Sequence, residues 1–102
     1  MRFCCVVFKN AVLDAGNKGI SVLCRNDEQS RCFYLQGRAC DAFEEAKLKN
    51  LPKNIDIPKL RIVEQTGIQF CPFCGMKLDI IITENEAAFD ELAKAHYSFL
   101  LH

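Results

Sequence analysis

The sequence predicts an α+β fold in which a small antiparallel sheet packs with two or three helices. Short runs of β-branched and aromatic residues alternate with polar turns, which is typical of hairpins. Elsewhere, apolar residues recur at three- and four-residue spacing, which is typical of amphipathic helices. The chain has 102 residues, of which 50% are apolar. This length predicts a single domain, 1–102, with a modest core.

A short amphipathic helix is predicted between Cys4 and Gly19. Its apolar positions recur every three or four residues, and the glycines that follow are typical of helix ends. The alternative is an opening strand over Phe3–Phe8, because this stretch is unbroken, apolar and rich in β-branched residues.

A β-hairpin is predicted from two runs of strand-forming residues, Ile20–Arg25 and Arg31–Gln36, which a polar five-residue turn connects. The expected register places Arg25 opposite Arg31. Both faces of this hairpin then carry apolar groups, so we expect other elements to cover each side.

A weaker helix is predicted from Asp41 to the residue before Pro52, followed by a loop as far as Pro58. Three shorter elements are expected after this loop: a strand over Leu60–Glu64, a second strand over Ile68–Phe70 beyond a turn at Thr66-Gly67, and a return strand over Met76–Ile82.

The last helix is predicted to begin at Glu84, because Thr83 and Glu86 have the spacing of a capping box. Its apolar face is formed by Phe89, Leu92, Ala93, His96 and Leu100. The apolar tail that follows, Tyr97–Leu101, is expected either to close the core or to form an interface.

The most informative motif is Cys71-Pro72-Phe73-Cys74-Gly75. Two thiolates at this spacing on a tight turn can bind one tetrahedral Zn²⁺. Proline restricts the turn, and glycine can adopt the left-handed conformation needed where the chain reverses. The segment is therefore predicted to be a zinc knuckle, which makes the expected fold zinc-ribbon-like.

The same two cysteines could instead form a redox dithiol of the glutaredoxin type, in which the first thiol lies at a helix N-terminus. Only 28 residues follow Cys74 in the chain of 102. A thioredoxin-like domain builds most of its sheet after its dithiol, so too little chain remains. Zinc binding is the preferred interpretation.

A closed structural site needs two further ligands. The sequence predicts Cys4, Cys5, Cys71 and Cys74 as the metal ligands, with Cys40 as the substitute for Cys4. Adjacent thiols can share a metal at a helix start, where Cys4 and Cys5 are expected to lie. The other candidates are predicted to have different roles: Cys24 and Cys32 as small buried residues, His96 as a core histidine and His102 as a mobile terminal residue.

Two segments, residues 3–19 and 67–78, carry a resemblance to a known kind of protein. The sequence resembles small uncharacterised bacterial and phage proteins of a zinc-ribbon-like kind, in which an N-terminal cysteine accompanies a late Cys-Pro-aromatic-Cys-Gly motif. Residues 33–39 are similar to the central strand of these proteins. The resemblance implies a ligand role for Cys5 and for the knuckle, and it implies no known activity.

The balance of charged residues helps to distinguish between possible classes of function. The 13 basic and 13 acidic residues give a formal net charge of zero, which removes a general attraction to nucleic acid or anionic membranes. No catalytic arrangement of Ser, His and Asp is apparent, and a closed thiolate site does not activate water. We therefore expect a non-enzymatic, zinc-stabilised module that binds a protein partner as a regulator, adaptor or inhibitor.

The alternative function is a nucleic-acid-binding zinc ribbon. It depends on a basic stretch that contains Lys47, Lys49, Lys53, Lys59 and Arg61. This stretch lacks interleaved aromatic residues, so a solvated loop is the preferred interpretation.

A cytoplasmic location is expected. Lys9 interrupts the N-terminal apolar stretch before it reaches the length of a signal peptide, and Ile80–Ile82 is too short to cross a bilayer. Reduced cysteines are the norm in that compartment, which favours metal ligation over disulfides.

Overall fold

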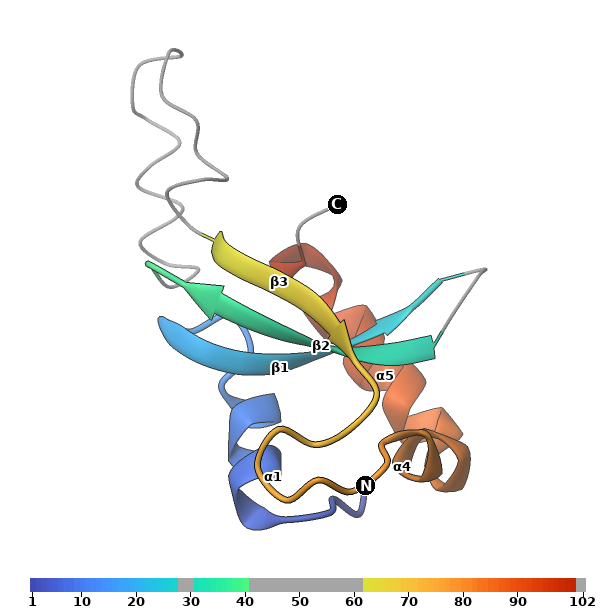
Figure 1. Cartoon of the computed structure of the whole chain (residues 1–102). Coiled ribbons are helices and arrows are strands. Elements are labelled where there is room, and N and C mark those ends of the chain that lie inside the picture. The colour runs from blue at the N-terminus through green and yellow to red at the C-terminus, as the bar shows by residue number, and fades with distance from the viewer. Residues whose placement is uncertain (28–30, 41–61, 101–102) are drawn as a thin grey trace, which may run out of the picture.

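The computed structural model describes residues 1–27, 31–40 and 62–100. Its architecture is α+β, as the sequence predicts (Figure 1). A three-stranded antiparallel sheet has the strand order β1-β2-β3. The elements are α1 (Val6–Leu13), β1 (Gly19–Asn26), β2 (Arg31–Arg38), β3 (Ile62–Ile68), α4 (Asp79–Glu84), α5 (Glu86–His96) and a final 3₁₀ turn, η1 (Tyr97–Phe99).

Helix α1 confirms the helical interpretation of the N-terminal segment over the strand alternative. Its buried face consists of Phe8, Ala11 and Val12. The chain leaves the helix through Gly16, whose φ of 86° lies in the left-handed region that favours glycine. The Phe99 ring lies about 3.0 Å from the place where a Cβ of residue 16 would stand, so this site also needs a residue without a side chain.

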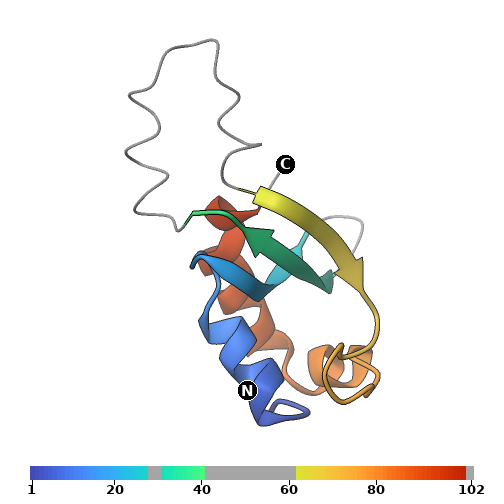
Figure 2. The same ribbon diagram turned by 60° about the vertical axis from the view of Figure 1, so that its left-hand side comes forward.

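The core lies between the sheet and the described helices α1, α4 and α5 (Figure 2). Its centre is a row of three rings: Phe33 of β2 packs edge-on against Phe8 of α1 at 5.1 Å and against Phe89 of α5 at 5.2 Å. All three are completely buried. Because one ring of the sheet contacts both helices, α1 and α5 cover the same face.

The opposite face of the sheet is also buried at several positions. Leu23 and Gln36 have no exposed surface, and Ser21 is 1% exposed. The Gln36 side chain donates hydrogen bonds to Gln65 Oε1 of β3 and to the Phe99 carbonyl of η1. The C-terminal segment therefore contributes to the second side of the sheet, and Leu100, 2% exposed, is buried with it. Of the predicted tail, Leu100 is thus core, whereas Tyr97 is 65% exposed.

The expected hairpin exists, but its predicted register is wrong by one residue. Arg25 pairs with Cys32, and Cys24 pairs with Phe33. A shift of one residue moves side chains to the other face of a strand. The observed register places Cys24 and Phe33 together on the helix side, where both are fully buried. Burial of this face determines the register, and the hairpin sequence alone does not reveal which face the helices cover.

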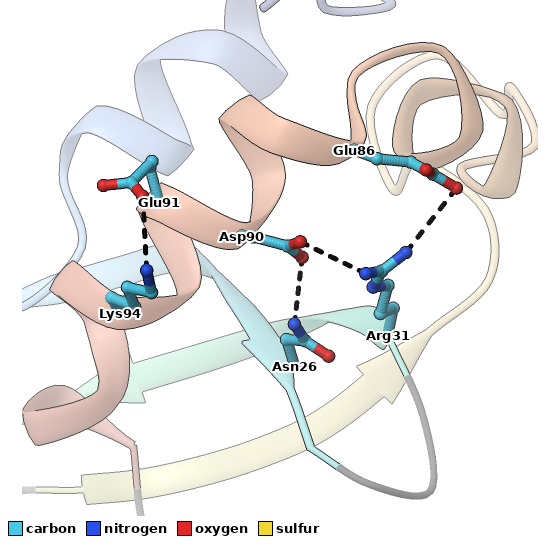
Figure 3. Close-up of polar contacts among 6 residues, drawn as sticks. All are labelled: Asn26, Arg31, Glu86, Asp90, Glu91 and Lys94. Atoms are coloured by element: carbon cyan, nitrogen blue, oxygen red, sulfur yellow. Dashed lines mark hydrogen bonds and ion pairs between the residues drawn. The ribbon is translucent and has the colours of Figure 1, made fainter.

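Helix α5 fixes the last pair of the hairpin (Figure 3). Asn26 and Arg31 are opposite each other, and Asp90 accepts a hydrogen bond from each of them, at 2.9 and 3.1 Å. Arg31 also lies 3.5 Å from a Glu86 carboxylate oxygen, and Lys94 pairs with Glu91 along the helix surface. The Asp90 carboxylate of α5 therefore binds both residues of the last hairpin pair.

Three predictions for residues 66–82 are wrong. The separate strand expected over Ile68–Phe70 does not form, because β3 ends at Ile68 and Phe70 makes only an isolated bridge. The expected turn at Thr66-Gly67 lies inside β3, where Gly67 pairs with Tyr34 of β2. The expected return strand over Met76–Ile82 is only the single bridge Phe70–Lys77, after which the chain forms α4. Tertiary packing outweighs the strand preference of the isoleucines, because a helix buries Leu78 and Ile81 against the core.

The last helix is confirmed, but its predicted start is two residues early. Thr83 does not cap α5; its hydroxyl donates to the Asp79 carbonyl inside α4. Asn85 separates the two helices, and α5 begins at Glu86. The predicted buried positions Phe89, Ala93 and His96 are confirmed.

Several sequence predictions fall outside the described residues. These are the helix from Asp41 to Pro52, the loop to Pro58, the basic stretch of the nucleic-acid alternative, and His102. The sheet itself consists of the predicted hairpin and a third strand, and the knuckle forms only an isolated bridge outside it. The zinc-ribbon-like part of the fold prediction is therefore not confirmed.

Candidate metal centre

Two segments far apart in sequence bring four thiols together. The ligand atoms of Cys4, Cys5, Cys71 and Cys74 all lie within 4.8 Å of one another. The first two precede α1, and the other two lie in the connection between β3 and α4, which passes beside the N-terminal segment in Figure 1. Among the residues that the structure describes, this is the one such group of three or more Cys, His, Asp or Glu side chains. All four are the residues predicted as ligands.

The connection between Cys71 and Cys74 has the geometry of a knuckle. The Gly75 amide donates to the Cys71 carbonyl at 2.9 Å, and the Cys71 amide donates to the Met76 carbonyl at 2.8 Å. Gly75 has a φ of 79°, which permits the chain to reverse. The amides of Phe73 and Cys74 both point at the Cys71 sulfur, each at 3.4 Å. The turn thus directs polarised N–H groups toward a sulfur, an arrangement that stabilises a thiolate.

Cys5 is positioned by the start of α1. It is the N-cap residue, with extended backbone, and its sulfur accepts a hydrogen bond from the Phe8 amide at 3.4 Å. The positive end of the helix dipole favours a negative charge at this position. The Cys5 and Cys71 sulfurs are 3.9 Å apart. Zn–S bonds of about 2.3 Å in a tetrahedral site give sulfurs about 3.8 Å apart, so this pair already has the required separation.

The remaining ligand position, Cys4, lies in a segment that a hydrogen bond ties to the junction of α4 and α5. The Arg2 amide donates to the Asn85 side chain at the junction of α4 and α5, at 3.4 Å. Asn85 in turn donates to the Ile81 carbonyl at 2.8 Å. The residues on either side of Cys4 are therefore held by a helix junction and by the start of α1.

The pKa values of Cys71, Cys4 and Cys5 are shifted in different directions. Although burial opposes its ionisation, the amides of Cys74 and Phe73 and the neighbouring thiols lower the pKa of Cys71 to about 7. Burial and hydrogen bonds to Cys74 and Cys71 raise the pKa of Cys4. The Phe8 amide lowers the pKa of Cys5, but burial and the neighbouring thiols together raise it. A bound cation would favour the thiolate form of every ligand, so metal binding would release protons.

The other cysteines lie outside the cluster. Cys40 is 7% exposed, and its carbonyl accepts a hydrogen bond from Arg38, so the structure does not place Cys40 in the position of Cys4. Cys24 is buried in the core, and burial raises the pKa of its thiol to about 12. Cys32 is only partly buried. The core role predicted for Cys24 is confirmed.

His96 is a core histidine and not part of the metal centre. The Cys24 amide donates to His96 Nδ1 at 2.9 Å, and His96 is 5% exposed. Because this amide points away from β2, the end of α5 covers the outer edge of β1. Burial lowers the pKa of His96, which keeps its imidazole neutral and able to accept the bond.

The geometry disfavours the dithiol alternative. A low-pKa dithiol cysteine of the glutaredoxin type starts a helix. Cys71 instead precedes a turn that Gly75 closes, and α4 begins only at Asp79. Cys71 is also only 3% exposed, which restricts its approach to an outside disulfide.

The sequence did not reveal the exposed apolar side chains that lie in and beside the segments carrying the four cysteines. The knuckle, the first turn of α1 and α4 carry large apolar residues with 44% to 71% of their surface exposed: Val6, Val7, Phe70, Phe73, Met76 and Ile80. We call these six residues the apolar rim. Their exposure follows from which neighbouring residues are buried in the folded protein. The sequence pattern does not contain this information.

Comparisons with known proteins identify no relative. A scan against family models, a search of curated proteins and a search of solved structures each found no match. Within the part of the chain that the structure describes, no helix combines the length and the apolar character needed to cross a membrane. The resemblance to zinc-ribbon-like bacterial and phage proteins therefore stays a prediction, and the four-cysteine cluster carries the functional argument.

Proposed function

We propose that this chain is a non-catalytic module which a structural Zn²⁺ stabilises through Cys4, Cys5, Cys71 and Cys74, and which binds a protein partner. The observation that carries the metal assignment is the convergence of four sulfurs within 4.8 Å. Four cysteines and no open position form the donor set of structural zinc sites. Sulfur ligands also favour zinc over magnesium, calcium or manganese.

The apolar rim supports the protein-binding part of the proposal. Large exposed apolar side chains that gather in one region are typical of protein interaction sites. Phe70 and Phe73, 55% and 45% exposed, flank the first cysteine of the knuckle, and aromatic residues are enriched at such interfaces. A zinc ion with four thiolates has a net charge of −2. The preferred partner therefore presents an apolar surface with Lys or Arg at its edge.

Metal analysis tests the zinc assignment. Protein purified without added metal should contain one zinc per chain by mass spectrometry. Cys5→Ser should lower both the zinc content and the melting temperature. Cys32→Ser is the matched control, since Cys32 lies outside the cluster and should leave both values unchanged. A metal-free wild-type protein with the same melting temperature in zinc and in chelator would reject the assignment.

Co-purification from the native host tests the binding role. The double variant Val7→Ser/Phe73→Ser should lose a partner that the wild-type chain retains, at unchanged zinc content. Tyr97→Ser is the control, because Tyr97 is 65% exposed but belongs to η1 rather than to the rim. Binding to mixed DNA or RNA with a steep loss as salt increases would instead support the nucleic-acid alternative.

A further inference from the structure

The four thiols of the cluster differ sharply in exposure. Cys71 is 3% exposed, Cys4 and Cys5 are partly buried, and Cys74 is exposed. All four sulfurs nevertheless lie within 4.8 Å of one another. Cys74 is therefore the member of the cluster that a small reagent in solution reaches most readily.

The sulfurs also differ in the backbone groups that face them. Cys71 accepts two amide hydrogen bonds and Cys5 accepts one, each at 3.4 Å. Among the residues that the structure describes, no backbone amide donates to the Cys74 sulfur. An N–H donor withdraws electron density from a thiolate and lowers its nucleophilicity, because it stabilises the charge that the nucleophile must give up. Cys74 is therefore both the most accessible and the least stabilised of the knuckle sulfurs.

We infer that Cys74 is a modification site at which a peroxide oxidises the zinc centre, and that this oxidation releases the metal. The inference rests on the proposed zinc site. Oxidation follows thiolate character and accessibility, and a cysteine beside a second thiol can be resolved to a disulfide. Cys74 meets both conditions: a metal would hold it as a thiolate, and its own amide lies 3.4 Å from the Cys71 sulfur.

The reaction has two steps. The Cys74 thiolate attacks one oxygen of the peroxide, the O–O bond breaks, hydroxide leaves and a sulfenic acid forms. The Cys71 thiolate then attacks the Cys74 sulfur, the S–O bond breaks, a second hydroxide leaves and the disulfide forms. The two sulfurs lose two electrons in total, which reduce the peroxide to two hydroxides. Only Cys4 and Cys5 would then remain as thiolate ligands, which are too few to hold a structural zinc ion.

Loss of the metal would separate the two halves of the apolar rim. Val6 and Val7 follow Cys5 at the start of α1, whereas Phe70, Phe73 and Met76 belong to the knuckle. The cluster is the point at which these two segments meet. Peroxide would thus control whether the two segments that carry the rim stay together, and through them the binding of the partner.

The test uses the zinc-loaded full-length chain and hydrogen peroxide. A chromogenic chelator measures zinc release, and peptide mass spectrometry maps the disulfides. We expect one zinc released per chain, a Cys71–Cys74 disulfide, unmodified Cys24, and recovery of the zinc site with reductant and added zinc. Cys74→His can retain a Cys₃His site and should release zinc more slowly than the wild-type chain. Cys32→Ser is the control and should release zinc at the wild-type rate.

The outcomes separate this inference from the proposed function. A protein that contains no zinc before peroxide is added contradicts the proposed function itself. A zinc-loaded protein that keeps its metal in peroxide, or whose first disulfide joins Cys4 or Cys5 to another residue, overturns the inference and leaves the zinc assignment intact. The disulfide map comes from the wild-type chain, so the inference remains testable if Cys74→His fails to fold.

Discussion

The two ends of this molecule are held together by different means. At the sheet end, eight-residue strands pair along their length, and Phe33 is completely buried between two other rings. At the metal end, one bridge and a few turn hydrogen bonds order the knuckle, while Phe70 and Phe73 remain about half exposed. Burial and backbone pairing stabilise the first end. The second has less of both, so in the proposed function coordination would supply much of its stability, and its exposed apolar side chains would contact the partner.

Of the changes considered, metal removal is expected to lower the stability of the protein most, and mainly at the metal end. A structural zinc site contributes on the order of 10 kcal/mol at neutral pH, which approaches the whole stability of a domain, about 5–15 kcal/mol. Chelation should therefore lower the melting temperature strongly. Hydrogen exchange should show lost protection first at α1 and the knuckle. Equal loss at the β1–β2 hairpin would show that the two ends are not energetically distinct.

Removal of the central ring tests the sheet end. Phe33→Ala should cost about 3–5 kcal/mol, because it leaves a cavity between Phe8 and Phe89. Denaturant unfolding of the zinc-loaded protein measures this loss. Val7→Ala, at an exposed position of α1, is the control and should change stability little. If the two variants lose similar stability, Phe33 is not the centre of the core.

His96 predicts how the sheet end responds to acid. Burial holds its folded-state pKa below the ordinary value of 6.5, so the unfolded chain takes up a proton before the folded chain does. The contribution of His96 to stability is complete above about pH 6.5, decreases as the pH falls below it, and becomes constant below the lowered pKa. His96→Phe should remove this pH dependence and cost about 1–3 kcal/mol at pH 7, because the Cys24 amide loses its acceptor. Stability measured for both proteins at each pH provides the difference, in which the acid sensitivity of the zinc site cancels.

The smallest effect is expected at the surface contact between α5 and the hairpin. Asp90→Ala removes the acceptor of Asn26 and Arg31, whose side chains are partly exposed, and should cost about 1 kcal/mol. Lys94→Ala removes a fully surface pair and should be neutral within error. Urea unfolding of both variants checks the order, and an effect of Lys94→Ala as large as that of Asp90→Ala would contradict it.

The sequence predicts the cluster better than it predicts the fold around it. Cys71 and Cys74 are identified by a local motif, because two sulfurs on one tight turn need no knowledge of the rest of the chain. Cys4 and Cys5 are harder to predict as ligands, since only the tertiary structure places them beside the knuckle. The amphipathic faces of α1 and α5 are likewise local signals, and both helices are confirmed.

The wrong predictions of secondary structure and strand register all concern features that tertiary packing determines. Residues 80–82 have strand preference but form a helix, because Ile81 is buried there against the core. Gly67 is typical of a turn but stays in β3 under the Tyr34 ring, about 3.7 Å from the place of a Cβ. The hairpin register is one residue off, because both faces are apolar and the pattern does not distinguish them.

The double role of Cys5 as helix cap and cluster member has a consequence for the order of assembly. Cys71 and Cys74 close a turn of four residues, whereas Cys5 and Cys71 are 66 residues apart. Joining such distant points costs roughly 4 kcal/mol of chain entropy, far more than closing the turn. A zinc ion should therefore be captured first by the knuckle, and the N-terminal segment should join last. On this account α1 would receive its capped first turn only in the final folding step, after a bound metal provides its anchoring point.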